Sequence, residues 1–137
     1  MTVPVGFVPH MRSSPVTRPW EPIYARETED RLILGIKVAE AHTNARGLVH
    51  GGLIAALADN AMGLSLGRHL TKLGRTVERG AVTTSLTLDY LGRAEIGMWL
   101  TFETGFIHAG RRTAVTEALV RADGAPVARA NAAFTFS

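Results

Sequence analysis

Asp59 is a lone carboxylate inside an almost wholly apolar run that covers residues 53–66. A stretch that is apolar on nearly all sides is typical of a buried helix. Because an ionised carboxylate is costly to bury unless it is paired, an acid in such a place is a candidate functional group. The tripeptide His-Gly-Gly at 50–52 comes directly before the run. We therefore expect a helix over about 51–69 that carries the chemistry.

The start of this helix offers a second chemical group. The first backbone amides of a helix have no partner inside it, and the helix dipole makes this end partly positive. Gly51 and Gly52 would let a ligand approach this backbone closely. The pair could then polarise a carbonyl oxygen, as an oxyanion hole does. Glycines here can equally serve a tight entry into the helix, and the residues alone leave both interpretations open.

The spacing between the two groups constrains how they can act. Gly51 and Asp59 are eight residues apart, which is ~12 Å along a helix axis. They cannot both touch one small reacting group from the same helix. If both act on one substrate, two chains must pair so that Asp59 of one faces Gly51 of the other. A two-fold homodimer would contain two such sites.

Other polar residues near the helix start have alternative roles. His50 could cap the helix or contact a substrate, and Asn44 could donate a hydrogen bond to a substrate or hold its own loop. No cluster of carboxylates accompanies His42 and His50, so we expect no metal site.

The remaining chain predicts strands around this helix. The segment 81–90 alternates with a period of two over ten residues, which is a strong strand signal. Short connections favour an antiparallel sheet, and a single sheet must then cover the helix. The fold class is thus α+β, with one long helix and five to six strands. The expected strands are 23–28, 31–40, 81–90, 98–107, 113–121 and 126–136.

Length and composition set the broad class. The 137 residues are enough for one domain, which we place at 20–137 after a Pro- and Ser-rich arm at 1–19 that we expect to be flexible. Cysteine is absent, which excludes disulfides and thiolate nucleophiles. No apolar run approaches the ~18 residues of a membrane span, and no signal peptide is visible, so we expect a cytoplasmic protein without a membrane partner.

The net charge of +3 is carried mostly by arginine, and the basic residues are scattered along the chain. This arrangement predicts no nucleic-acid partner. Arginine suits phosphate and carboxylate groups of small molecules. A preference for GC-rich codons explains the same composition equally well.

The segment 43–63 contains a specific motif, Thr43-Asn44-x-x-Gly47-x-x-His50-Gly51-Gly52, followed by Ala56-Leu57-Ala58-Asp59-Asn60-Ala61-Met62-Gly63. This motif resembles that of the hotdog-fold acyl-CoA thioesterases, in particular their phenylacetyl-CoA thioesterase-like (PaaI-type) branch. The similarity covers roughly residues 20–136, and weaker matches lie at 81–91, 110–112 and 123–130.

The resemblance implies a long helix wrapped by an antiparallel sheet, obligate dimers with interface sites, and a dimer of dimers. It implies hydrolysis of an acyl-CoA to a free acid and CoA, with no cofactor beyond the CoA of the substrate. Asp59 would be the general base or nucleophile, and the amide of Gly51 would polarise the thioester carbonyl. Asn44 and His50 would orient the substrate, with Gly52 beside them.

Three further substrate-binding residues follow from the resemblance. Some relatives place Ser or Thr on the first long strand near the attacking water, and the match falls on Thr83. By parity Thr83 lies opposite Leu86, so either a bulge near 83–85 re-aims it or that face meets the partner chain. Arg111 and Arg112 are candidates for the CoA phosphates. Arg68 with His69 at the helix end, or Arg93 after a strand, could serve as well, and a solvated surface role is the alternative for each of them.

Two other functions share the same fold. One is an acyl-CoA-binding protein without catalysis, although the retention of Asp59 and the shortness of the arm at 1–19 weigh against it. The other is a hydroxyacyl-CoA dehydratase, which pairs a histidine with an acid. The acyl group itself is not encoded in any motif.

Overall fold

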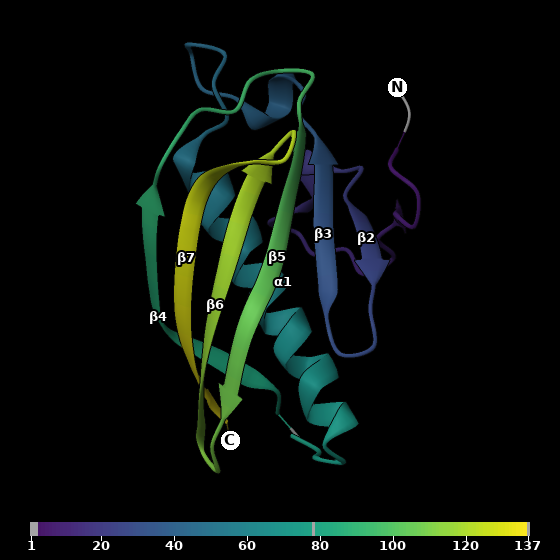
Figure 1. Ribbon diagram of the computed structural model, residues 1–137, viewed down its shortest axis with the longest axis vertical. Coiled ribbons are helices and arrows are strands. Elements are labelled where there is room, and N and C mark those ends of the chain that lie inside the picture. Colours follow the sequence, from purple (N-terminus) through teal and green to yellow (C-terminus); the bar gives the residue numbers. More distant parts are fainter. Residues whose placement is uncertain (1–2, 78, 137) are drawn as a thin grey trace.

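One long helix, α1 (Gly51–Lys72), lies across a single antiparallel sheet in the computed structural model, which describes residues 3–77 and 79–136 (Figure 1). Two short 3-10 helices, at Arg18–Trp20 and Glu40–His42, occur in the connections. The strands are β1 (Val8–Pro9), β2 (Tyr24–Glu27), β3 (Leu32–Lys37), β4 (Ala81–Tyr90), β5 (Trp99–Ala109), β6 (Thr113–Ala122) and β7 (Ala125–Phe136).

The sheet has the strand order β1-β2-β3-β5-β6-β7-β4, and every neighbouring pair is antiparallel. The chain therefore leaves the sheet after β3, forms α1 on one face, and returns at the far edge as β4. The predicted α+β class with one helix and one antiparallel sheet is confirmed. The sheet contains seven strands rather than five or six, because two residues of the arm add β1.

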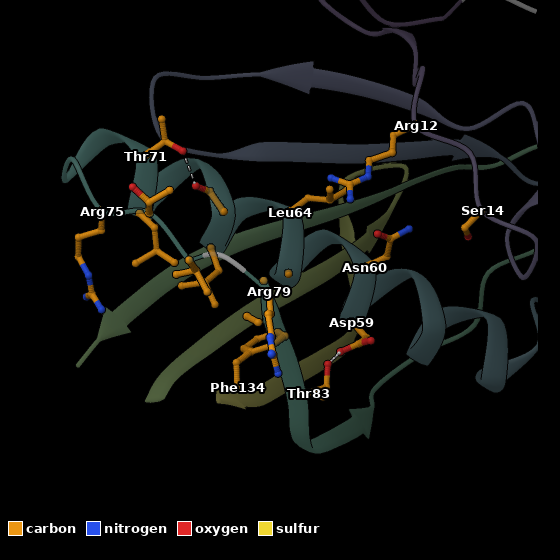
Figure 2. Close-up of a pocket in the computed structure, with 18 residues that line it drawn as sticks. Arg12, Ser14, Asp59, Asn60, Leu64, Thr71, Arg75, Arg79, Thr83 and Phe134 are labelled. Carbon is orange, nitrogen blue, oxygen red and sulfur yellow. Dashed lines mark hydrogen bonds between the residues drawn. The ribbon is translucent and has the colours of Figure 1, made fainter. Parts of the chain in front are cut away.

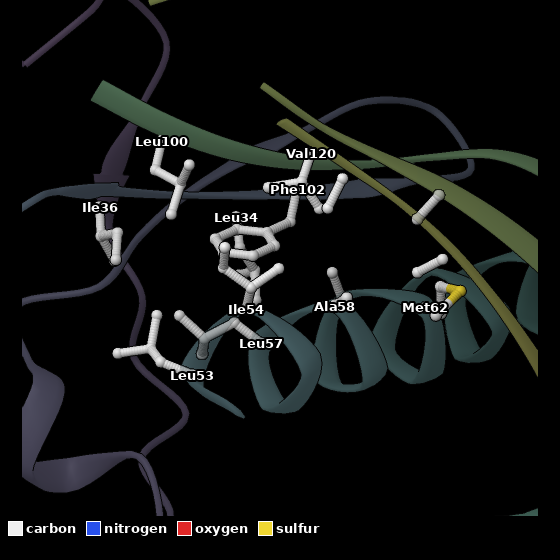
Figure 3. Packing of buried hydrophobic residues seen from close by; sticks show 14 of the residues in the cluster. Leu34, Ile36, Leu53, Ile54, Leu57, Ala58, Met62, Leu100, Phe102 and Val120 are labelled. Carbon is white, nitrogen blue, oxygen red and sulfur yellow. The ribbon is translucent and has the colours of Figure 1, made fainter. Parts of the chain in front are cut away.

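The sheet-facing side of α1 forms the core. Figure 3 shows Ile54 pointing from the helix toward Leu34 of β3 and Phe102 of β5, with Leu57 beside it and Leu53 at the helix start. All five side chains are buried. Burial of each large apolar side chain contributes ~1.5–3 kcal/mol relative to an exposed one, so this contact fixes the helix on the sheet. The backbone of α1 is thereby held against β3 and β5.

The opposite side of α1 is only partly covered. Asp59, Asn60, Gly63 and Leu64 are half-buried, and Gly67 is exposed. The expectation that the helix is buried on nearly all sides is therefore wrong for a single chain. Glycine and alanine count as apolar in the sequence pattern, but their side chains are too small to cover this side of the helix. This side of α1 carries Asp59.

The N-terminal segment lies against the domain. β1 pairs with β2, and the amide of His10 donates to the carbonyl of Ile23 at 2.7 Å. The ring of Phe7 packs edge-on against Trp99, with the centroids 5.2 Å apart. Thr17 is buried and makes a turn with Ser14. These contacts place residues 10–17 beside α1, while the mobility of the arm stays a prediction.

Within the residues that the structure describes, no helix is long and apolar enough to cross a membrane.

Candidate functional site

Asp59 is held by a neighbouring hydroxyl. The Oγ1 of Thr83 donates to the Oδ1 of Asp59 at 2.7 Å, between the first third of β4 and the middle of α1 (Figure 2). The pairing of β4 with β7 shifts register between Thr83 and Ser85. This irregularity is the bulge that the sequence offered as one of two alternatives, and it explains how Thr83 can face the helix. The bond leaves the second oxygen of Asp59 available for chemistry.

A cavity of about 690 Å³ adjoins this pair (Figure 2). Its walls come from α1, from the loop after α1, from β4 and from the N-terminal arm. Arg12 and Ser14 come from the arm, and Arg75 and Arg79 come from the loop. Asp59 is the single acidic residue among the described residues of the lining. The described part of the lining thus combines one carboxylate with several cationic groups.

A smaller cavity of about 280 Å³ lies next to the same carboxylate. Its walls include Ser14, Val16 and Thr17 of the arm together with Ala56 and Asp59 of α1. The arm therefore forms part of the surroundings of Asp59, a contact that no sequence pattern indicates.

His50 caps the start of α1. Its Nδ1 accepts the backbone N–H of Gly52 at 2.8 Å. Because Nδ1 is an acceptor, a neutral ring carries its hydrogen on Nε2. The ring of His50 is exposed, so this Nε2–H is available to a ligand. The capping alternative for His50 is thus confirmed, and it does not exclude contact with a substrate.

The two glycines at the helix start are covered by aromatic rings of the same chain. A Cβ on Gly52 would lie 2.9 Å from Nδ1 of His50, and a Cβ on Gly51 would lie 3.3 Å from the ring of Tyr90. The hydroxyl of Tyr90 also donates to the carbonyl of Gly51 at 2.6 Å. The space that the missing side chains leave is therefore filled by His50 and Tyr90.

The amide hydrogen of Gly51 differs from that of Gly52. No acceptor for the Gly51 N–H is found in residues 3–77 and 79–136, whereas the Gly52 N–H is bound to His50. Gly51 is also the first residue of α1, where the helix dipole favours negative charge. Of the two glycines, Gly51 therefore offers the free donor.

Asn44 holds the loop that leads to the helix. Its Oδ1 accepts the backbone N–H groups of Arg46 at 2.9 Å and of Leu48 at 3.2 Å. The loop-holding role of Asn44 is confirmed. The side-chain NH2 of Asn44 has no acceptor within the described part of the chain, so it remains able to donate to a ligand.

The structure divides the predicted residues into three groups. Asn44, His50, Gly51 and Gly52 lie at the N-terminal end of α1, and Asp59 lies with Thr83 two turns further along. The third group consists of Arg111 and Arg112. They lie in the turn between β5 and β6, at the end of the molecule opposite the helix start (Figure 1). Neither arginine lines the two cavities beside Asp59. One chain therefore does not bring the three groups together.

Sequence reasoning did not identify Tyr90 as part of the site. Its only signal was an aromatic residue at the end of an alternating strand. The contact with Gly51 depends on how β4 crosses the helix start, which no local pattern reports. For metals, no group of three His, Cys, Asp or Glu side chains forms a candidate centre among the described residues.

Comparison with known proteins adds independent information. A family model described as "Thioesterase superfamily" matches residues 46–128. A Pseudomonas aeruginosa protein that carries the name of an esterase is 34% identical over 135 residues, which cover 98% of this chain and 97% of that protein. Human acyl-coenzyme A thioesterase 13 is 33% identical over 88 residues, or 63% of this chain, and the match spans 57% of the human protein.

Among solved structures, a variant of the phenylacetic acid degradation protein PaaI from Thermus thermophilus has the same fold. The TM-score is 0.75 at 22% identity, and the match covers 89% of this chain and 98% of that chain. The expected hotdog fold is thereby confirmed. Because a family model matches more than half of its length and a relative is 34% identical along nearly all of it, the chain belongs to the thioesterase superfamily and is a thioester hydrolase.

Proposed function

We propose that the protein hydrolyses an acyl-CoA thioester to a free carboxylic acid and CoA, at sites built from two subunits. The observation that supports this most directly is the carboxylate of Asp59, which is held by Thr83 at 2.7 Å beside a cavity of about 690 Å³. The name of the human relative supplies the acyl-CoA class of substrate. The acyl group stays open, as it did from the sequence.

Two chemical routes fit the geometry. In one, Asp59 removes a proton from water and the hydroxide adds to the thioester carbon. In the other, Asp59 attacks that carbon itself, and water then hydrolyses the mixed anhydride. In both, the oxyanion collapses, the C–S bond breaks and the CoA thiolate takes up a proton. The Gly51 N–H would donate to the oxyanion, so neither route needs a cofactor.

The positions of these groups support a dimer. Gly51 and Asp59 lie on the same helix, ~12 Å apart along its axis, so one chain cannot supply both to one carbonyl. β4 supports a partner at this side of the molecule, because it is a ten-residue edge strand that pairs only with β7 in the described chain. Val82, Leu86 and Tyr90 on β4 are 57%, 38% and 53% exposed. Proteins rarely leave such an apolar edge uncovered.

The other predicted residues receive roles within this dimer. The free NH2 of Asn44 and the Nε2–H of His50 would donate to the substrate near Gly51, and Gly52 would hold His50 in place. Arg111 and Arg112 are exposed and would reach the CoA phosphates from a neighbouring subunit.

A larger assembly and the location in the cell are also proposals. The sheet face that points away from α1 exposes Phe106 and Val115, at 52% and 47%, which would suit the pairing of two dimers. A cytoplasmic location stays a prediction from the sequence.

The alternative functions are less well supported by the geometry. A dehydratase would use a histidine as a base, but the Nδ1 lone pair of His50 is already occupied by the Gly52 N–H. The neutral ring then presents only an N–H on its other side. A binding protein without catalysis would gain nothing from a carboxylate aligned by Thr83, since it adds a desolvated charge.

The test is release of free thiol from phenylacetyl-, benzoyl-, short-chain and medium-chain CoA. We expect turnover by the wild type and a loss of at least ~100-fold in kcat for Asp59→Asn. The matched control is Asp30→Asn, because Asp30 lies in the β2–β3 turn outside both cavities. Binding of acyl-CoA without hydrolysis would favour the binding protein. Full turnover in Asp59→Asn would overturn the role of Asp59.

A further inference from the structure

A single peptide unit at the start of α1 is held by side chains at both of its ends. The Tyr90 hydroxyl donates to the carbonyl oxygen of Gly51 at 2.6 Å. The N–H of the same peptide unit belongs to Gly52 and donates to Nδ1 of His50 at 2.8 Å. Because a peptide unit is planar, these two hydrogen bonds fix the orientation of the whole plane.

Glycine gives this added restraint a purpose. Two successive glycines have more backbone freedom than most other pairs of residues, so the side-chain contacts add to the hydrogen bonds of α1 in limiting the orientation of this peptide unit. The ring of Tyr90 adds a steric limit, because its nearest atoms lie 3.3 Å from the position that a Cβ of Gly51 would take. Gly51 is thus restrained by a hydrogen bond on its carbonyl and by a ring against its Cα.

The restraint acts on the neighbouring donor. The N–H of Gly51, which has no acceptor among the described residues, belongs to the preceding peptide unit, which is joined to the fixed plane through the Cα of Gly51. When the Gly51 carbonyl is fixed, the direction of its N–H varies less. A donor that already points at the developing oxyanion needs no reorganisation during the reaction.

The same contact acts on His50. A hydrogen bond to a carbonyl oxygen polarises the amide, so the Gly52 N–H becomes a better donor to Nδ1. A stronger bond at Nδ1 holds the ring in the form that carries hydrogen on Nε2. Tyr90 therefore influences two groups that face the substrate, although its own hydroxyl is directed at the backbone.

We propose that Tyr90 is a positioning residue. Through its hydrogen bond to the peptide unit between Gly51 and Gly52, it orients the Gly51 amide and fixes the ring form of His50. This inference rests on the proposed thioesterase function for its effect on rate. The expected geometry at His50 and Gly52 does not depend on it.

The test compares Tyr90→Phe with Tyr24→Phe. Both variants lose one phenolic hydroxyl and keep the ring, and these are the two tyrosines of the chain. Tyr24 lies on β2, where its ring packs against Trp99 at 5.9 Å, away from the helix start. We expect Tyr90→Phe to lower kcat by about tenfold with little change in KM, because the donor is less well oriented in the transition state. Tyr24→Phe should keep the wild-type kcat.

A second measurement is independent of activity. Nitrogen-15 NMR of the His50 ring reports which nitrogen carries the hydrogen, and amide hydrogen exchange reports how well the Gly52 N–H is held. In Tyr90→Phe we expect a mixture of the two neutral ring forms and at least ~10-fold faster exchange at Gly52. Tyr24→Phe should match the wild type in both.

The outcomes distinguish the positioning role of Tyr90 from the proposed thioesterase function. Unchanged ring form and unchanged Gly52 exchange in Tyr90→Phe would overturn the positioning role, whatever the activity. If these readouts change as expected but the wild type hydrolyses no acyl-CoA, the positioning role of Tyr90 is supported and the proposed function is wrong. Equal losses of kcat in the two variants would show a general structural effect and would also overturn the proposal.

Discussion

The hydroxyl of Thr83 donates to Oδ1 of Asp59 at 2.7 Å within one chain. Hydrogen bonds to a charged carboxylate are shorter and stronger than those between neutral groups. This bond therefore fixes the rotation of the carboxylate and leaves Oδ2 to meet a water molecule or a carbonyl carbon. The bulge in β4 at Thr83–Ser85 is what turns the threonine toward α1.

Replacement of Thr83 tests this alignment. Thr83→Val keeps the shape of the side chain and removes the hydroxyl, so Asp59 would lose its fixed rotation. We expect kcat to fall by at least ~10-fold, and Thr83→Ser to recover most of the loss because it restores the donor. Steady-state kinetics of thiol release measure both variants. Wild-type kcat in Thr83→Val would show that the carboxylate needs no such partner.

The amide of Gly51 can be removed without removing the helix. Gly51→Pro eliminates the N–H at the first helical position, where proline is tolerated, and the backbone of His50 at φ −67° and ψ 131° suits a residue before proline. Gly51→Ala is the matched control, since it also adds a Cβ at 3.3 Å from Tyr90 but keeps the N–H. We expect a loss of ~100-fold in kcat for the proline variant and a clearly smaller loss for alanine. Equal kinetics in the two variants would contradict a role for the amide.

We expect replacement of Ser65 to change the stability of the fold rather than its activity. This buried side chain accepts from the N–H of Leu32 at 3.1 Å and donates to the carbonyl of Leu32 at 3.2 Å. Leu32 lies before the part of β3 that pairs with β5. Ser65→Ala leaves both groups without this partner, so we expect the free energy of unfolding to fall by ~1–3 kcal/mol. Urea unfolding measures it, and Ser13→Ala on the exposed arm should change it little.

His10 makes the stability of the docked arm depend on pH. Burial lowers the pKa of His10 from its ordinary 6.5, the charge of Arg12 lowers it further, and Glu21 opposes both. The folded chain thus keeps this ring neutral at a pH where the unfolded chain protonates it. Stability is present above pH 6.5 and is lost as the pH falls below that value, because the unfolded state then binds more protons.

The measurement compares melting temperatures at pH 7.5 and 5.5. We expect a smaller drop in His10→Gln than in the wild type, since glutamine does not titrate. His108→Gln is the control at an exposed histidine and should behave like the wild type. Equal drops in all three proteins would remove His10 as the source of the dependence.

The sequence predicted the frame of the site because periodic patterns report it directly. The ten-residue alternation at 81–90 has the same bounds as β4. The helix predicted at 51–69 begins where α1 begins and ends three residues before Lys72. The contact between His50 and Gly52 is local, and capping is one of the two roles that the sequence indicates for His50. Each of these features depends on residues that are close in the chain.

The parts that sequence reasoning missed depend on contacts between distant segments. Tyr90 reaches Gly51 across 39 residues, and Ser65 reaches Leu32 across 33. The arm residues Arg12 and Ser14 reach the surroundings of Asp59 because β1 adds to the edge of β2. Two residues are too few for an alternating pattern, so β1 had no signal of its own. Tertiary packing alone decides these positions.

A mixing experiment tests whether each site is shared between two subunits. Asp59→Asn and Gly51→Pro should each be nearly inactive alone. In a hybrid dimer, one site combines both defects, and the other combines the native Asp59 of one subunit with the native Gly51 of the other. Random exchange makes half of the dimers hybrids with one working site in two, so about a quarter of the wild-type activity should return.

The exchange is made by partial denaturation and refolding of the two variants together, and the product is assayed by thiol release. The control mixes Asp59→Asn with Thr83→Val, whose changes fall on the same half-site. In that hybrid, the Thr83→Val subunit keeps its Asp59 but lacks the hydroxyl that aligns it, so each site carries one defect. Activity there should not exceed the average of the separate variants. If the mixture of Asp59→Asn and Gly51→Pro stays as inactive as its parents although hybrids form by mass spectrometry, the two groups do not act across a subunit interface.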